Sequence, residues 1–232
     1  MPQNQKVLNT EEKEIQEMLE KGIHFGCFSD KLHPKMKDFC FGMRNDFAVI
    51  DLFKAKERTK EAFEFLSQSK KEGRSFLIVG TKQVAQKLVE EFAKEFNFPY
   101  VNQRWIGGLL TNFEVIKKRI NLLKEMEEKA QSEEVKKMLK KEKIKFEKTL
   151  ERMRRKFSGV KNLEKLPEVL IIVDPAREEI AVEEARKKGV KTVGIAGLDS
   201  DPQKLDFFIL ANTNSLTSLR YIFSKIKEAF EK

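Results

Sequence analysis

Cysteine and long apolar runs are scarce in this sequence, and each shortage excludes a class of protein. The 232 residues include two cysteines, Cys27 and Cys40, which provide no disulfide framework and fit a reducing cytosol. The purest apolar runs, such as VLIIV at 169–173, are far shorter than the roughly 20 residues of a membrane-spanning helix. The hydrophilic start, MPQNQKVLNTEEKEIQ, lacks the apolar segment of a signal peptide. We therefore expect a cytoplasmic protein without a membrane partner.

Histidine is equally scarce, and the motifs of several enzyme classes are missing. Both histidines, His24 and His33, lie near the amino terminus, which leaves no other histidine to assist a Ser or Cys nucleophile. No G-x-G-x-x-G motif follows a predicted strand. Residues 80–82 (GTK) resemble the end of a phosphate-binding loop, but Ser75 replaces the first glycine that such a loop requires. We therefore expect neither catalysis of these kinds nor a cofactor.

Carboxylates at strand ends leave open the alternative that the protein is a doubly wound enzyme or a phosphoacceptor domain. In other folds such carboxylates hold magnesium or accept a phosphoryl group. Turn formation and helix capping are the simpler interpretation, because aspartate side chains accept hydrogen bonds from free backbone N–H groups. The aspartates concerned are Asp51, Asp174, Asp199 and Asp201.

Four residues that can bind metals lie within 17 positions of one another near the amino terminus. Their spacing, H-x2-C-x5-H-x6-C, differs from the tighter paired spacing of a zinc knuckle. Packed histidines and buried thiols are therefore the simpler interpretation, and a zinc-stabilised module is the alternative. The four residues are His24, Cys27, His33 and Cys40.

Short β-branched runs alternate with helical patterns along most of the chain. The apolar runs are nearly continuous, as parallel strands covered on both faces require. This alternation predicts a doubly wound α/β fold. The predicted strands are residues 47–50, 76–79, 100–102, 169–173, 192–195 and 207–210. The predicted helices are residues 10–21, 52–71, 81–96, 177–188 and 216–230.

A long insertion interrupts this alternation, because 66 residues separate Asn102 from Val169 where a crossover needs about a dozen. Two apolar series at helical spacing flank a polar turn at 131–134, with Glu127 and Lys143 as polar exceptions. They predict an antiparallel helical arm at 112–157, with helices of about 18 residues and a length of roughly 27 Å. Residues 1–111 and 158–232 would form the globular domain. The two series are Phe113, Ile116, Ile120, Leu123 and Ala130, then Leu139, Phe146, Leu150, Met153 and Phe157.

Basic charge is concentrated on this insertion. Residues 113–157 contain 16 Lys and Arg and 9 Glu, a net +7 of the +9 carried by the whole chain. One interpretation is that these side chains only keep an exposed hairpin soluble. Negative charge, however, would keep a hairpin soluble as well as positive charge does. An unbalanced positive charge suits the phosphates of a nucleic acid better.

The loop before the arm, VNQRWIGGLLTN at 101–112, contains the only tryptophan of the chain. Thr111 and Glu114 fit a capping box, which predicts Thr111 as the N-cap of the first arm helix. Glycines 107 and 108 allow a sharp turn of the backbone. Trp105 is either an apolar plug at the base of the arm or a stacking surface for a partner. The polar loop residues that could contact a partner are Gln103, Arg104 and Asn112.

This loop also carries a family resemblance. The pattern V-N-x-R-W-[IL]-G-G-x-L-T-N at 101–112 resembles the signature of small-subunit ribosomal protein two, bacterial type. Residues 22–52, 76–85 and 166–190 are similar to further blocks of that family, in the same order. The resemblance implies a flavodoxin-like, doubly wound parallel sheet with an inserted antiparallel helical (coiled-coil) hairpin. It also implies a structural constituent of the small ribosomal subunit, which functions in translation and is not an enzyme.

The resemblance further implies partners and site residues. The expected partners are small-subunit rRNA and neighbouring small-subunit ribosomal proteins, including the first small-subunit protein in many bacteria, and no homo-oligomer is expected. The sequence departs from the family pattern at Cys27 and Gln103, where histidine is common, and at 197–202, which lacks a Thr-Asn pair. The rRNA-binding candidates, taken by position, are Lys35, Lys37, Arg44, Asn45, Lys82, Arg104, Trp105, Thr111 and Asn112.

Overall fold

The computed structural model describes residues 10–132 and 139–231. The chain divides into two compact units. The terminal unit comprises Met1–Glu72 and Gly194–Lys232, and the central unit comprises Gly73–Val193.

Five strands form a parallel sheet in the order β5-β4-β6-β7-β8. Counted along the chain from β4, this is the order 2-1-3-4-5 of flavodoxin-like folds, and the predicted fold class is confirmed. The strands are β4 (Phe76–Val79), β5 (Tyr100–Val101), β6 (Val169–Val173), β7 (Lys191–Ala196) and β8 (Phe207–Leu210).

Strand β4 lies between β5 and β6 in the central unit. Ile78 of β4 pairs with Tyr100 of β5, and Phe76 pairs with Val169 of β6, both in parallel register. Every residue of β4 and β6 is buried, as expected for strands that are covered on both faces. The helices that follow these two strands are α3 (Gln83–Phe96) and α7 (Glu179–Lys188).

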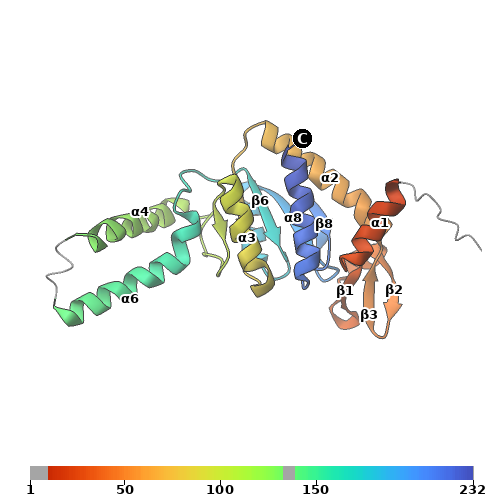
Figure 1. Ribbon diagram of the computed structural model, residues 1–232, viewed down its shortest axis with the longest axis horizontal. Helices are drawn as coiled ribbons and strands as arrows, with labels where there is room; N and C mark the ends of the chain where they lie inside the picture. Colours follow the sequence, from red (N-terminus) through yellow and green to blue (C-terminus); the bar gives the residue numbers. More distant parts are fainter. Residues whose placement is uncertain (1–9, 133–138, 232) are drawn as a thin grey trace, which may run out of the picture. The chain divides into compact units, whose positions relative to one another are not determined.

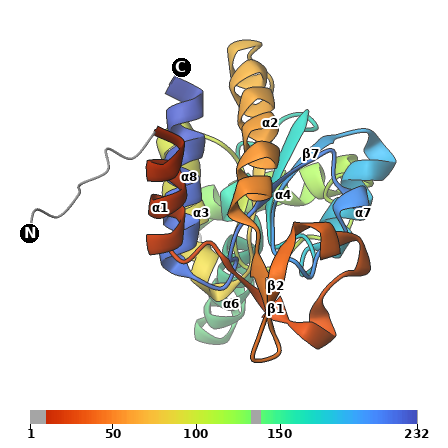
Figure 2. The same ribbon diagram turned by 90° about the vertical axis from the view of Figure 1, so that its right-hand side faces the viewer.

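The terminal unit contains an antiparallel sheet that the sequence analysis missed (Figure 2). Its order is β1-β3-β2, formed by Phe25–Phe28, Phe47–Ile50 and Cys40–Arg44 respectively. Residues 47–50 are a strand as predicted, but their assignment to the parallel sheet was wrong. Asn45 and Asp46 join β2 to β3 with φ angles of 49° and 60°. Two consecutive positive φ angles are typical of a tight hairpin turn, and this Asn-Asp pair was the available signal.

The terminal unit also contains α1 (Thr10–Glu20), α2 (Leu52–Lys71) and α8 (Leu216–Glu231) (Figures 1 and 2). Helix α2 packs against β8 and α8. Asp51 caps α2, because its Oδ1 accepts hydrogen bonds from the backbone N of Phe53 (3.0 Å) and Lys54 (3.3 Å). Within the described ranges, the helices are all too short or too polar to cross a membrane.

The insertion contains α4 (Phe113–Ala130) and α6 (Lys140–Phe157), each of 18 residues as predicted. The two helices lie side by side and run in opposite directions (Figure 1). Part of the predicted polar turn, residues 133 and 134, lies outside the described residues. The apolar series is buried in α4 as far as Leu123, whereas in α6 Leu150 and Phe157 are the buried residues. Coiled-coil packing along the whole arm, and the arm boundaries of 112–157, stay predictions.

Candidate nucleic-acid interface

One buried carboxylate holds the loop that joins β5 to α4. It belongs to Glu184 of α7, which is 6% exposed. Its Oε1 accepts hydrogen bonds from Trp105 Nε1 (3.1 Å) and from the backbone N of Gly108 (2.7 Å). Its Oε2 accepts from the backbone N of Leu110 (3.0 Å) and from both N and Oγ1 of Thr111 (3.1 Å each). Five donors from one loop therefore converge on a single side chain.

The donors keep the Glu184 carboxylate ionised. Burial raises the pKa of Glu184, but the hydrogen bonds from Gly108, Trp105, Thr111 and Leu110 outweigh burial and hold the pKa below its ordinary value. A carboxylate that accepts several backbone N–H groups is stabilised in its charged form. The loop conformation and the charge of Glu184 therefore stabilise each other.

Glu184 was not predicted as a site residue, because it lies in a charged helix, where a glutamate is normally solvated. The available signal was its helical phase. Ala181 and Ala185 are buried on the same face, so that Glu184 lies one position from an apolar stripe with a period of three to four residues.

Trp105 is 8% exposed and donates its indole N–H to Glu184. Leu109 and Leu110 of the same loop are fully buried. Of the two alternatives for the tryptophan, the structure therefore shows the apolar plug at the base of the arm. A ring in this position has little surface available for stacking on a base.

The predicted capping box is wrong. Helix α4 begins at Phe113 with Asn112 as its N-cap, and no side chain caps it. Thr111 instead directs both its backbone N–H and its hydroxyl to Glu184. Hydrogen bonds to an ionised carboxylate are stronger than neutral capping bonds. This difference explains why Thr111 bonds to Glu184 and does not cap α4. Gly108 has a φ of 85° and supports the predicted turn at this position.

Gln103 and Arg104 are exposed polar residues at the start of the loop. Asn102 precedes them and donates from Nδ2 to the Gln86 carbonyl (3.3 Å) and to Glu90 Oε2 (3.1 Å). Gln103 and Arg104 follow and are exposed, and the chain then turns inward at Trp105. Arg104 therefore lies between two anchored neighbours.

The ends of β4 and β6 form the position where open α/β sheets usually bind ligands, because the strand order reverses between them. Lys82 follows β4 and Asp174 follows β6, and their Nζ and Oδ2 atoms are 2.6 Å apart. Asp174 is buried, with a φ of 62°. The hydroxyl and backbone N–H of Thr81 donate to Glu178 Oε1. Asp174 thus has a structural ion pair at the turn, in agreement with the simpler interpretation of this aspartate.

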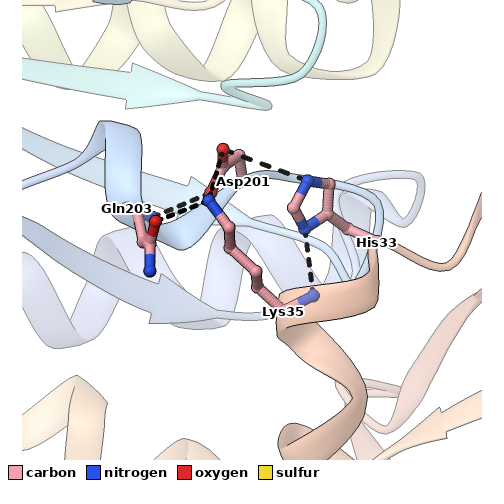
Figure 3. A network of polar contacts seen from close by, with 4 residues as sticks. All are labelled: His33, Lys35, Asp201 and Gln203. Carbon is pink, nitrogen blue, oxygen red and sulfur yellow. Dashed lines mark hydrogen bonds and ion pairs between the residues drawn. The ribbon is translucent and has the colours of Figure 1, made fainter.

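Lys35 also lies in a network of polar contacts (Figure 3). Its Nζ is 3.3 Å from both carboxylate oxygens of Asp201 and 2.5 Å from Gln203 Oε1. The Nε2 of His33 is 4.0 Å from Asp201 Oδ2 (Figure 3). Burial raises the pKa of Asp201, but the Gln203 N–H and the Lys35 ammonium hold it below its ordinary value. The Asp201 carboxylate also caps the short helix η4 (Pro202–Lys204), as its predicted turn role requires.

The other candidates of the first sequence block are exposed. Lys37 lies in the 3-10 helix η2 (Pro34–Phe39), and Arg44 and Asn45 lie at the β2–β3 turn. These three residues present polar groups to solvent. Lys35 is also exposed, but its ammonium is paired with Asp201.

Three of the four possible zinc ligands, His24, His33 and Cys40, have contacts with other residues. The His24 ring lies 4.1 Å from the ring of Phe25, and Cys40 Sγ donates to the Gly42 carbonyl (3.3 Å). Burial raises the pKa of the Cys27 thiol to about 11. Across residues 10–132 and 139–231, no three His, Cys, Asp or Glu side chains are grouped as metal ligands.

The two arm helices differ in charge. Helix α6 contains nine Lys or Arg and three Glu, a net +6, whereas α4 contains five Lys or Arg and four Glu, a net +1. Residues 140–145 of α6 are all exposed. Glu127 of α4, the predicted polar exception, accepts hydrogen bonds from Arg154 Nε (2.8 Å) and Lys161 Nζ.

These features define a class of protein: a basic α/β protein with a helical insertion and a supported loop. Its strand-end carboxylates Asp51, Asp174 and Asp201 serve as caps or ion-pair partners. The family model of ribosomal protein S2 matches residues 18–232. The chain is 43% identical to the small ribosomal subunit protein uS2 of Dictyoglomus thermophilum, over 93% of this chain and 87% of the relative. It is 40% identical to that of Koribacter versatilis, over 93% of this chain and 71% of the relative. The chain belongs to the ribosomal protein S2 family.

Membership of this family confirms the predicted function. Proteins of the family are structural constituents of the small ribosomal subunit in translation and are not enzymes. As a small-subunit ribosomal protein, the chain is expected to bind rRNA and other ribosomal proteins.

Proposed function

We propose that the chain binds small-subunit rRNA in the cytoplasmic ribosome through two surfaces, helix α6 and the exposed residues of the 101–112 loop. The observation that carries the proposal is the net +6 on the 18 residues of α6. Each phosphate that such a surface neutralises releases counterions and adds salt-dependent affinity. We also propose that residues 112–157 act as the RNA-binding arm of a globular domain formed by 1–111 and 158–232.

The candidate residues take different parts in this proposal, according to their geometry. Direct contacts with phosphates or base edges are proposed for the exposed candidates. Lys35 and Lys82 are already paired with Asp201 and Asp174. The negative charge of each aspartate offsets the positive charge of its lysine, so we expect these two lysines to attract phosphates more weakly. Trp105 and Thr111 support the loop through their hydrogen bonds to Glu184. The candidates proposed for direct contact, all of which are exposed, are Lys37, Arg44, Asn45, Arg104 and Asn112.

For the protein partners we propose the antiparallel sheet of the terminal unit as the docking face. Phe25, Phe28, Phe41 and Met43 are exposed on β1 and β2. Exposed aromatic clusters are typical of protein–protein contact sites. The proposed partners are neighbouring small-subunit proteins, including the first small-subunit protein, rather than a second copy of this chain.

Filter binding of the full chain to small-subunit rRNA, at a series of salt concentrations, tests the RNA proposal. We expect the logarithm of the affinity to fall linearly with the logarithm of salt concentration, with a slope of about −4 to −6 for about five to seven phosphate contacts. Binding that does not change with ionic strength would contradict the proposal. An unrelated RNA of equal length serves as the control, because it measures the non-specific electrostatic part alone.

A further inference from the structure

We propose that Glu184 is a positioning residue for RNA recognition, which fixes the 101–112 loop so that Arg104 is presented in one orientation before RNA binds. The proposal rests on the proposed function, because it takes Arg104 as an rRNA contact. Glu184 itself is buried and does not touch the RNA. Its effect passes through the loop that it holds.

Two anchored residues flank Arg104 along the loop. The side chain of Asn102 is bonded to Gln86 and Glu90 of α3. The indole of Trp105 is bonded to Glu184 of α7. Only two residues separate these anchors, and both are exposed. The backbone of Arg104 is therefore held from both sides, by two different helices.

Several backbone donors of the loop are already bonded within the protein. A glycine-containing turn before a helix often binds phosphate through its backbone N–H groups. Here the N–H groups of Gly108, Leu110 and Thr111 all point to the Glu184 carboxylate. Glu184 thus occupies the position that a phosphate takes in an anion-binding loop. RNA must then be recognised by side chains of the loop, and Arg104 is its exposed cation.

A loop that is already fixed before RNA binds strengthens binding, because the conformational entropy of the loop is lost during folding and not on binding. Holding the backbone of one residue in one conformation corresponds to about a tenfold change in an equilibrium constant. Loss of the Glu184 contacts would release several loop residues. We expect a loss of about ten- to thirtyfold in rRNA affinity, since the contacts of Asn102 with α3 and the attachment to β5 still restrict the chain.

The test compares Glu184→Gln with Glu183→Gln in the full chain. Glu183 is the adjacent, exposed residue of α7, so both variants remove one negative charge from the same helix. We expect Glu183→Gln to bind rRNA like the unsubstituted chain, within about twofold, and Glu184→Gln to bind about tenfold more weakly than this control. Equal affinities of the two variants would overturn the proposal. If Glu184→Gln does not fold, Glu184→Asp replaces it, because it keeps the charge but shortens the reach by one methylene.

A double-mutant cycle with Arg104→Ala separates positioning from a general structural role. If Glu184 acts through Arg104, the substitution at 184 costs less than about twofold in affinity once Arg104 is absent, while its cost in unfolding free energy is unchanged. The same tenfold loss in both backgrounds would overturn the positioning role. If the unsubstituted chain has no salt-dependent rRNA affinity, the proposed function fails first, which the same titration reveals.

Discussion

Helices α4 and α6 have the same length of 18 residues but differ in charge and in burial. Helix α4 has a net charge of +1 and buries Phe113, Ile116, Ile120 and Leu123. Helix α6 has a net charge of +6 and buries two residues near its carboxyl end. One helix therefore supplies most of the packing of the arm, and the other supplies most of its charge.

The polar contacts of α4 follow the same division. Glu127 of α4 binds Arg154 of α6 and Lys161 beyond it, and Lys117 Nζ donates to the Glu164 carbonyl at 3.0 Å. Charged groups on α4 thus hold neighbouring segments. The basic residues in the first half of α6 face solvent. A net charge counted over the whole arm therefore conceals which of the two helices is free to bind a polyanion.

Neutralising one face of α6 should produce the largest effect. Lys141, Lys145 and Lys148 lie on one face at helical spacing and are exposed. Replacing all three with glutamine should reduce the salt slope of rRNA binding by about two to three units, because each lost phosphate contact removes about 0.7 unit on single strands and about 0.9 unit on B-form duplexes. At about 0.1 M salt the affinity should fall by about a hundredfold. Filter binding across a salt series measures both quantities.

The matched control neutralises the same number of charges on α4. Replacing Lys118, Arg119 and Lys124 with glutamine changes the net charge equally, and we expect the salt slope to change by less than about one unit. Equal losses from the two triple variants would mean that total charge alone governs binding. The division between the helices would then be wrong.

The packing of α4 should contribute more to stability than the packing of α6, which is the reverse of their expected contributions to RNA binding. Leu123 of α4 is fully buried, so Leu123→Ala should lower the free energy of unfolding by about 2–5 kcal/mol. Ile144 of α6 is 44% exposed, and Ile144→Ala should cost less than about 1 kcal/mol, as surface substitutions usually do. Denaturant unfolding followed by the fluorescence of Trp105 measures both. A cost at Ile144 as large as that at Leu123 would contradict the assignment of packing to α4.

Much of the fold could be predicted because its signals are local. The strands at 76–79, 169–173 and 207–210 and the helix at 52–71 agree with the structure residue for residue. Each strand is an uninterrupted apolar run, and the helix follows an aspartate that caps it. The assignment of residues 47–50 to the parallel sheet failed because a short apolar run does not reveal its pairing partner.

The candidate site was less predictable because its organising contacts are not local. Glu184 and Glu183 are adjacent glutamates in the same helix. Helical phase places Glu184 nearer the buried stripe, but only the loop that folds over it gives it its role as an anchor. That loop lies 73 to 79 residues earlier in the chain. The motif at 101–112 was identified from the sequence, but the Glu184 carboxylate that the loop surrounds was not. Likewise, the pairing of Lys35 with Asp201 spans 166 residues, and no local pattern indicates it.

The smallest predicted effect concerns the link between the two helices, and it depends on pH. Hydrogen bonds from Lys161 and Arg154 lower the pKa of Glu127 below its ordinary value. A carboxylate with a depressed pKa in the folded state stabilises the protein above its unfolded-state pKa. This contribution is lost as the pH falls through the folded-state pKa. We expect Glu127→Gln to cost about 0.5–1 kcal/mol at neutral pH, as partly exposed ion pairs do, and the cost should approach zero in acid.

Denaturant unfolding of both chains between neutral and acidic pH measures this difference. Glu125→Gln is the matched control, because Glu125 is an exposed glutamate of the same helix, and its cost should stay near zero at every pH. A cost of Glu127→Gln that grows on acidification would contradict the expected sign of the pH dependence. In that case Glu127 would not join α4 to α6 through its charge, and the packing of Leu123 and its apolar neighbours would be the main connection between the structural and the basic helix.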